Sequence, residues 1–273
     1  MIAQPIYAAH RSRKVVVANL LSMNELRITV AVRGYRISDW AELLPGGAVL
    51  LTNDNVIVLA DLHLGCEAAL EYEGLSIPRV QMKKITEYIE SVIRAIEPSK
   101  VIVAGDLKHN FSRNLTQEWR DVRAFVSLLA DWAPVQVVKG NHDNYLNLIL
   151  RECGVPPMRS ELRVGDVTVV HGHKTAAAKG ALVMGHLHPS LTLRDSVRAS
   201  VKDRCFLWNP GRQVLVLPAM SLVAAGVDVI ASPDVDQMSP LLSSGGLSEC
   251  FPIVFAGEKA LKFPSVGDLR RSM

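Results

Sequence analysis

Short apolar runs that each lead into a polar side chain recur along the middle of this chain. The five runs are rich in valine and isoleucine and occupy residues 57–60, 101–104, 135–138, 167–170 and 181–184. They do not alternate between apolar and polar positions, which is typical of strands that are covered on both faces. We therefore predict five buried strands with a polar side chain near the end of each.

Two longer segments between the first three runs have a different period. Residues 78–96 and 116–132 carry apolar side chains at largely helical spacing, and Thr116 with Glu118 is typical of a helix start. Alternating strands and helices predict an α/β fold in which two mixed β-sheets pack face to face and helices flank them. The carboxyl ends of the strands are the expected place for a site.

The pattern changes after residue 188, and it sets the expected domain limits. Short strands separated by turns are predicted at 191–201, 205–208 and 213–217, and a last strand at 253–256 follows a loop over 231–249 that is rich in Ser, Pro, Gly and Asp. We expect one domain, preceded by a strand region that joins the core and by a flexible extension, and followed by a tail. These parts cover residues 46–262, 23–45, 1–22 and 263–273, and either Met1 or Met23 could be the natural start.

Composition narrows the function classes only a little. The 273 residues are 49% hydrophobic, which is enough for a large core, and the net charge of +3 is compatible with an anionic substrate. The four cysteines are scattered without a Cys-x-x-Cys pair, so neither a disulfide framework nor a zinc knuckle is expected. The longest apolar stretch, 214–227, is too short to span a membrane, and no signal peptide is apparent. We expect a cytoplasmic protein without membrane contact.

The polar residues at the strand ends are of types that bind metal ions. Asp61 and His63 are two residues apart, so their side chains project to the same side of a strand. Each element is weak alone, since Gly-Asp is ordinary turn chemistry and a lone histidine is usually structural. In chain order the elements are Asp61 with His63, Gly105-Asp106, Gly140-Asn141-His142-Asp143, His171, and Gly185-His186 with His188. Together they indicate a two-metal hydrolytic site.

This ordered series resembles the calcineurin-like metallophosphoesterases over residues 57–188. The resemblance implies a four-layer sandwich with a dinuclear site. It places Asp61, His63, Asp106 and His188 on one metal ion, with Asp106 bridging, and it completes the second ion with Asn141, His171 and His186. His142 would be an acid near the leaving group that binds no metal.

The ligand types and the resemblance together predict the cofactors and the reaction. Mixed oxygen and nitrogen ligands without a thiolate favour two Mn²⁺ ions, although Zn²⁺, Fe²⁺ and Ni²⁺ remain open. The chain is also similar to a prokaryotic subgroup related to the nuclease SbcD or associated with DNA ligase and helicase. This similarity implies phosphodiester hydrolysis in DNA repair, DNA or RNA as substrate, and a helicase or ligase as partner.

The sequence leaves other functions and the oligomeric state open. The same residues suit a phosphomonoesterase or a cyclic-nucleotide phosphodiesterase. Some relatives with this fold are non-catalytic protein-binding scaffolds, usually with eroded ligands. The complete ligand set argues against a scaffold.

Several further residues are candidates for contact with the substrate or with a ligand. His109 follows Asp106 closely, as does Lys108, and His173 follows His171, although His173 could equally face solvent. Asp143 could orient His142 or a neighbouring ligand, or start a helix. Two basic groups could meet phosphates or simply face solvent, namely Arg79 with Lys83 and Lys84, and Arg194, Arg198, Lys202, Arg204 and Arg212.

Overall fold

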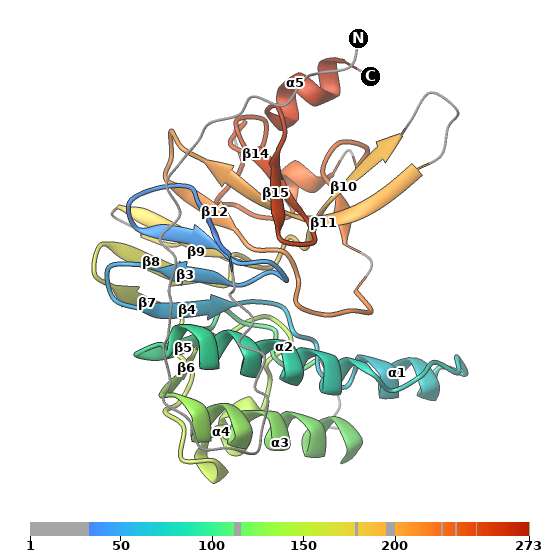
Figure 1. Cartoon of the computed structure of the whole chain (residues 1–273). Coiled ribbons are helices and arrows are strands. Elements are labelled where there is room, and N and C mark those ends of the chain that lie inside the picture. The colour runs from blue at the N-terminus through green and yellow to red at the C-terminus, as the bar shows by residue number, and fades with distance from the viewer. Residues whose placement is uncertain are drawn as a thin grey trace, which may run out of the picture.

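A computed structural model shows an α/β sandwich of two mixed β-sheets (Figure 1). The structure describes residues 33–111, 116–177, 180–194, 200–224, 226–232, 234–243 and 245–272. Residues 23–32, where part of the N-terminal strand region is expected, lie outside the described residues. Among the described helices, none is both long and apolar enough to cross a bilayer.

The first sheet has six strands in the order β1-β2-β3-β4-β5-β6. Their bounds are Tyr35–Arg36, Ala41–Leu43, Val49–Leu51, Val56–Leu59, Lys100–Val103 and Val135–Val137. The strands β4, β5 and β6 are parallel, and β3 is antiparallel to β4. The first three predicted strands are therefore confirmed as neighbours whose carboxyl ends meet at one edge.

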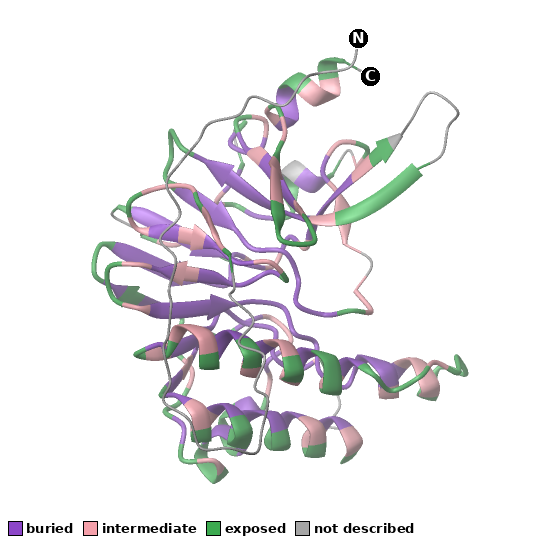
Figure 2. Cartoon of the chain, in the orientation of Figure 1, coloured by how far each residue is buried: buried purple, intermediate pink, exposed green. Residues whose placement is uncertain are grey.

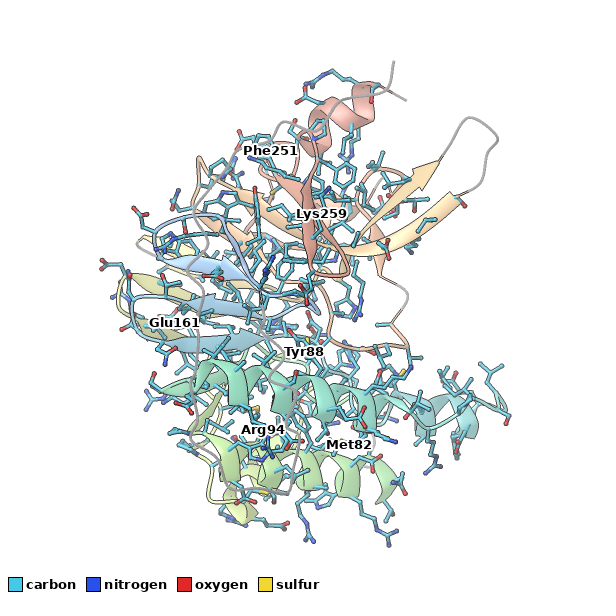
Figure 3. All side chains as sticks on the ribbon, in the orientation of Figure 1. Met82, Tyr88, Arg94, Glu161, Phe251 and Lys259 are labelled. Atoms are coloured by element: carbon cyan, nitrogen blue, oxygen red, sulfur yellow. The ribbon has the colours of Figure 1, made fainter. Side chains whose placement is uncertain are left out.

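Helices cover the outer face of the first sheet (Figure 1). They are α2 (Gln81–Ile96), α3 (Thr116–Trp132) and α4 (Leu146–Glu152), whereas α1 (Cys66–Tyr72) extends past the ends of the strands. Ile89 of α2 and Phe125 of α3 are buried in one apolar core with strand residues such as Leu59. Arg94 of α2 pairs with Glu90 of the same helix on the side toward α3, whereas Tyr88 packs against the loop before β3 (Figure 3).

The second sheet has the order β13-β10-β11-β12-β9-β8-β7, and β14 pairs with β11 and β15. The bounds of β7 to β12 are Glu161–Val164, Val167–Val170, Ala181–Met184, Pro189–Arg194, Ser200–Asn209 and Val214–Val216. Those of β13 to β15 are Val227–Asp228, Phe251–Ala256 and Lys259–Lys262. The strands β8, β9 and β12 run parallel, and a core of buried side chains lies between the two sheets.

One strand expected in the C-terminal third is wrong. Residues 191–201 do not form one strand, because β10 and β11 are separate antiparallel strands in which Leu193 pairs with Val201. The expected tail contains α5 (Val266–Arg271), and Val266 is fully buried. The loop over 231–249 also contributes to a third core, on the outer face of the second sheet, through Val235 and Leu242. Buried residues accordingly follow the strands of both sheets in Figure 2.

Candidate metal centre

The predicted ligands and the predicted acid His142 come from five loops that follow strands of both sheets. The loops after β4, β5 and β6 carry Asp61 with His63, Asp106, and Asn141 with His142, and the loops after β8 and β9 carry His171, and His186 with His188. The structure brings all of these side chains together, as the distances below show.

Five of these residues have left-handed backbone conformations. The φ angles are 56° for Asp61, 47° for His63, 51° for Asp106, 71° for His186 and 45° for His188. A non-glycine residue in this region costs on the order of 1 to 3 kcal/mol, and such strain tends to occur at functional sites. Here each abrupt turn directly after a buried strand places a polar side chain at the same edge of the sandwich.

Asp61, His63 and His188 form a first group, whose possible ligand atoms lie within 4.8 Å of one another. The Nε2 atoms of His63 and His188 face each other at 3.1 Å, and Asp61 Oδ1 lies 3.5 Å from Nε2 of His188. Asp61 Oδ2 accepts a hydrogen bond from the backbone N–H of His186 at 2.8 Å. Asp61 Oδ1 is buried without a hydrogen-bond partner, so this carboxylate oxygen is free to bind a cation.

Asp106, His171 and His186 form a second group by the same criterion, and Asn141 adjoins it. His171 Nδ1 lies 2.9 Å from the carbonyl oxygen of Ala104, to which it donates. This bond orients His171 Nε2 toward Asn141 Oδ1 at 2.9 Å and Asp106 Oδ2 at 3.3 Å. His186 Nε2 lies 3.2 Å from the carbonyl oxygen of Met238, so its other ring nitrogen is the available ligand atom.

The Asp106 carboxylate lies between the two groups. Its Oδ2 is 3.8 Å from His63 Nε2 and 3.3 Å from His171 Nε2. Burial alone would raise the pKa of Asp106, but the hydrogen bond and charge of His171 outweigh burial and hold the pKa well below its usual range. Asp106 is therefore an ionised carboxylate whose Oδ2 lies near a histidine of each group.

The three imidazoles nearest to Asp61 and Asp106 differ in protonation. Burial lowers the pKa of His63 to about 3, so His63 is neutral. Burial would also lower the pKa of His188 and His171, but nearby carboxylates outweigh it. Asp61 raises the pKa of His188, and Asp106 with Asp61 raises that of His171 to about 9. The same carboxylates that raise the pKa of His171 and His188 would also attract a cation to their ring nitrogens.

His142 lies beside these groups and is more open to solvent. Its Nδ1 donates to the carbonyl oxygen of His109 at 2.5 Å, which leaves Nε2 facing Asp106 Oδ2 at 4.0 Å. The side chain is 28% exposed, against 2% for Asp106. His109 lies next to it with stacked rings, and His63, His109 and His142 form a third convergent group. The structure therefore places His109 at the site.

Asp143 ties the loops after β5 and β6 together. Its buried carboxylate accepts hydrogen bonds from the backbone N–H groups of Asp106 and Gly140, both at 2.8 Å, and of Leu107 at 2.9 Å. Burial and the charge of Asp106 raise the pKa of Asp143 to about 6. Asp143 does not cap α4, whose N-cap is Tyr145, so the structure favours the ligand-orienting role over helix initiation.

Gly140 serves close packing rather than a sharp backbone turn. A Cβ atom at this position would lie 2.1 Å from Asp106 Oδ1, and the φ of Gly140 is not positive. Glycine therefore lets the Asp106 carboxylate approach the backbone of the neighbouring loop.

Gln81, which the sequence reasoning missed, connects the first ligand loop to the second sheet. Its Nε2 donates to the carbonyl oxygens of Leu62 at 3.3 Å and His63 at 3.0 Å. Its Oε1 accepts from the Ser221 hydroxyl at 2.7 Å and from the Leu222 N–H at 2.9 Å. Nothing in the strand-end pattern signals a polar residue at a helix start that is only 1% exposed.

Of the remaining candidates for substrate or ligand contact, the structure places His173 beside the ligands and Arg79 away from them. The ring of His173 lies 5.2 Å from that of His171 and 6.0 Å from that of His186, so it adjoins the second group. Burial lowers the pKa of His173 to about 4. Arg79 is not brought to the ligands, because its guanidinium pairs with Glu71 of α1.

Two of the candidate basic side chains bind within the protein. Lys108 does not reach toward a substrate, since its ammonium is buried against Glu118 at 3.2 Å. Arg204 does not face a nucleic-acid groove, because its Nη1 donates to the carbonyl oxygens of residues 219–221. Arg212 pairs with Glu249, and Lys202 bonds to the carbonyl oxygen of Gly226. The side chain of Arg194 and the whole of Arg198 lie outside the described residues.

The donor set fits two divalent cations. Carboxylate oxygens, an amide oxygen and imidazole nitrogens without a thiolate suit Mn²⁺, Zn²⁺, Fe²⁺ or Ni²⁺. The unpartnered Asp61 Oδ1 and the two facing Nε2 atoms of His63 and His188 are explained if a cation lies between them. The Asp106 carboxylate supplies an oxygen within reach of both groups.

A family model and solved structures are similar to this chain. A model of the family described as calcineurin-like phosphoesterase matches residues 55–208. Among curated proteins, none matches the sequence. The solved structure of Pseudomonas putida nuclease MPE is 15% identical with a TM-score of 0.60, over 82% of this chain and 94% of that chain.

A second solved structure is less similar. YfcE, a phosphoesterase from E. coli, is 16% identical with a TM-score of 0.37, over 63% of this chain and 83% of that chain. At these identities, the likeness to nuclease MPE shows the fold.

Proposed function

Because this chain belongs to the calcineurin-like phosphoesterase family, we propose that it hydrolyses phosphodiesters with two divalent metal ions at the metal centre. The observation that carries the proposal is the position of Asp106 Oδ2 between His63 Nε2 and His171 Nε2. Asp61, His63, Asp106 and His188 would hold one ion, and Asp106, Asn141, His171 and His186 the other.

Two bound divalent ions supply an activated water and positive charge for the phosphoryl oxygens. The residues of this chain then orient the reaction. His142 turns its Nε2 toward the reacting groups, because Nδ1–H donates to the His109 carbonyl oxygen. With both ring nitrogens protonated, the imidazolium would give its Nε2 proton to the leaving-group oxygen and return to the neutral Nδ1–H form. Neutral Asn141 keeps the positive charge of the site in excess, and Asp143 fixes the loop that carries Asp106.

The proposed substrate is a nucleic acid, and the proposed setting is DNA repair. The support is the resemblance to the SbcD-related and ligase- or helicase-associated subgroup, together with the net charge of +3. The solved neighbour of similar fold is a nuclease, which makes DNA the first polymer to test. Manganese as the native metal and association with a helicase or ligase belong to the same proposal.

A substrate panel tests the function directly. The metal-supplemented protein would be assayed with bis-p-nitrophenyl phosphate, p-nitrophenyl phosphate, and labelled single- and double-stranded DNA. We expect hydrolysis of the diesters to exceed that of the monoester. A preference for p-nitrophenyl phosphate would instead establish a phosphomonoesterase, and no hydrolysis by a protein with two bound metal ions would contradict catalysis.

A further inference from the structure

An exposed aromatic ring lies beside the proposed acid. Phe111 is 56% exposed, and its ring centroid is 6.2 Å from that of His142, with the two planes at 83°. Phe111 lies in the segment after β5 that also carries Asp106 and His109. A large apolar side chain at this place loses the stabilisation that burial would give.

The backbone beneath Phe111 is anchored on several sides. Its own carbonyl oxygen accepts a hydrogen bond from Asn144 Nδ2 at 3.0 Å. The carbonyl oxygen of His109 accepts from His142 Nδ1, and the N–H of His109 donates to Leu64 at 3.0 Å. The ring is therefore presented on a fixed support that also holds His142.

A buried ion pair completes this support. Lys108 and Glu118 lie 3.2 Å apart, and each side chain is only 3% exposed. The Lys108 ammonium donates to the carbonyl oxygen of Asn110, while Glu118 accepts from the N–H of Asn110 at 3.1 Å. Burying two charges is costly unless their geometry is satisfied, and here they clamp the residue directly before Phe111.

We propose that Phe111 is a specificity residue that stacks on a nucleobase beside the scissile phosphate, on the leaving-group side. The inference deepens the proposed function and rests on it. Proteins that bind single-stranded nucleic acids stack the bases on exposed aromatic side chains with little preference for sequence. Phe111 is such a ring, and it is held in a fixed position next to the proposed acid. In a duplex, neighbouring bases already cover the faces, so the substrate class is single-stranded nucleic acid or an unpaired end.

The test compares substrates with and without bases. Phe111→Ala, Phe111→Trp and the wild type would be assayed on a short single-stranded oligonucleotide and on an oligomer of the same length built from abasic sugar phosphates. A phosphotyrosine peptide is the third substrate. Leu128→Ala, at a partly exposed apolar position on α3, is the control variant.

We expect Phe111→Ala to raise KM for the oligonucleotide about tenfold with little change in kcat, because stacking stabilises the substrate and the transition state alike. The abasic oligomer should be hydrolysed equally by both proteins. Phe111→Trp should restore KM, and Leu128→Ala should behave as wild type.

Three results would overturn the stacking role. One is an equal KM for the oligonucleotide in Phe111→Ala and wild type, and another is an equal loss on both oligomers. The third is a loss confined to the phosphotyrosine peptide. If the wild type hydrolyses neither oligomer while binding two metal ions, the proposed diesterase function fails, and the stacking role fails with it.

Discussion

Several of the proposed ligand residues have strained backbone conformations. Asp61, His63 and Asp106 have positive φ. Gln81 and Ser221 donate hydrogen bonds to the backbone carbonyl oxygens of His63 and Asp61, and the Asp143 carboxylate accepts one from the N–H of Asp106. The residue types at such positions are fixed by their chemistry rather than by conformational preference, since glycine would relieve the strain but could not bind a metal.

His142→Ala should lower turnover of a diester by roughly 10²- to 10⁴-fold, which is the usual contribution of a positioned acid. The two metal ions should stay bound, because His142 is not among the proposed ligands. Its Nδ1 donates to a carbonyl oxygen, and its side chain is more exposed than that of the ligand Asp106. Steady-state kinetics and elemental analysis check both parts, with His173→Ala as a comparison, and unchanged turnover would rule out the acid role.

A second prediction follows from the protonation of His171. Its pKa of about 9 in the folded protein lies above the ordinary 6.5. In the metal-free protein this proton contributes stability below pH 6.5, and the contribution is lost as pH rises through about 9. A metal ion at Nε2 must displace the proton, so metal binding at pH 7.5 should release it.

Calorimetry in buffers with different ionisation enthalpies would measure that release. The apparent metal affinity should also rise between pH 7 and 9. His171→Gln removes this titrating group and is the control. Binding heats that do not depend on the buffer would contradict the predicted displacement.

Residue types at strand ends were predictable from sequence because metal chemistry restricts them to few kinds. Asp61, Asp106 and His171 could be found in this way. The fate of Arg204 could not, since a cation on a strand gives no sign that its guanidinium will bind the carbonyl oxygens of a distant loop. The same holds for Lys108, whose partner Glu118 lies on another element.

At the scale of elements, the continuous apolar runs were sufficient to predict β4, β5, β8 and β9. The helices α1 and α4 were missed because each has only seven residues, too few for a clear helical period. Both begin after a residue in the left-handed conformation and lack a side-chain cap, so the usual start signals are absent from their sequences.

Gln81 at the start of α2 leads to an element-scale prediction. Gln81→Leu keeps the volume but leaves the carbonyl oxygens of Leu62 and His63 and the Ser221 hydroxyl without this partner. We expect the free energy of unfolding to fall by about 1 to 3 kcal/mol. Metal affinity should fall about 10- to 100-fold, because the loop that orients Asp61 and His63 is loosened.

Chemical denaturation in chelator and metal titration would separate the two effects. Gln117→Leu is the matched control, since Gln117 also lies in the first turn of a helix and its Nε2 donates to Asp121 of the same helix. It should change stability by less than about 0.5 kcal/mol. A Gln81→Leu variant with normal metal affinity would limit Gln81 to a structural role.

At the scale of the whole molecule, the metal centre joins the two sheets. The loops after β4 to β6 belong to the first sheet, and those after β8 and β9 to the second. Sequence patterns predicted two packed sheets, but not that β10 and β11 would separate or that the loop over 231–249 would cover the second sheet. Such long-range pairing depends on partners that no local pattern specifies.

This arrangement predicts that metal ions stabilise the fold. At a free metal concentration about 100 times Kd, each site adds about 2.7 kcal/mol to the free energy of unfolding, provided that the unfolded chain binds no metal. For a protein of this size, that corresponds to a rise in Tm of roughly 5 to 10 °C for each occupied site. Asp106→Asn should reduce both metal occupancy and the rise.

Thermal unfolding with added Mn²⁺ and with chelator would measure the difference. The Leu128→Ala variant should keep the full rise, because Leu128 lies on the outer helical layer away from the ligands. Equal Tm values for the wild type under both conditions would contradict the stabilising role.

The division of the ligands between two sheets also sets an order of events during synthesis. His63 and His188 are 125 positions apart, yet their rings meet at 3.1 Å. A growing chain that ends after β6 has delivered Asp61, His63 and Asp106 but lacks His171, His186 and His188. The ribosome must therefore release most of the sandwich before either ion can find its complete set of ligands, which makes metal capture a late step of maturation.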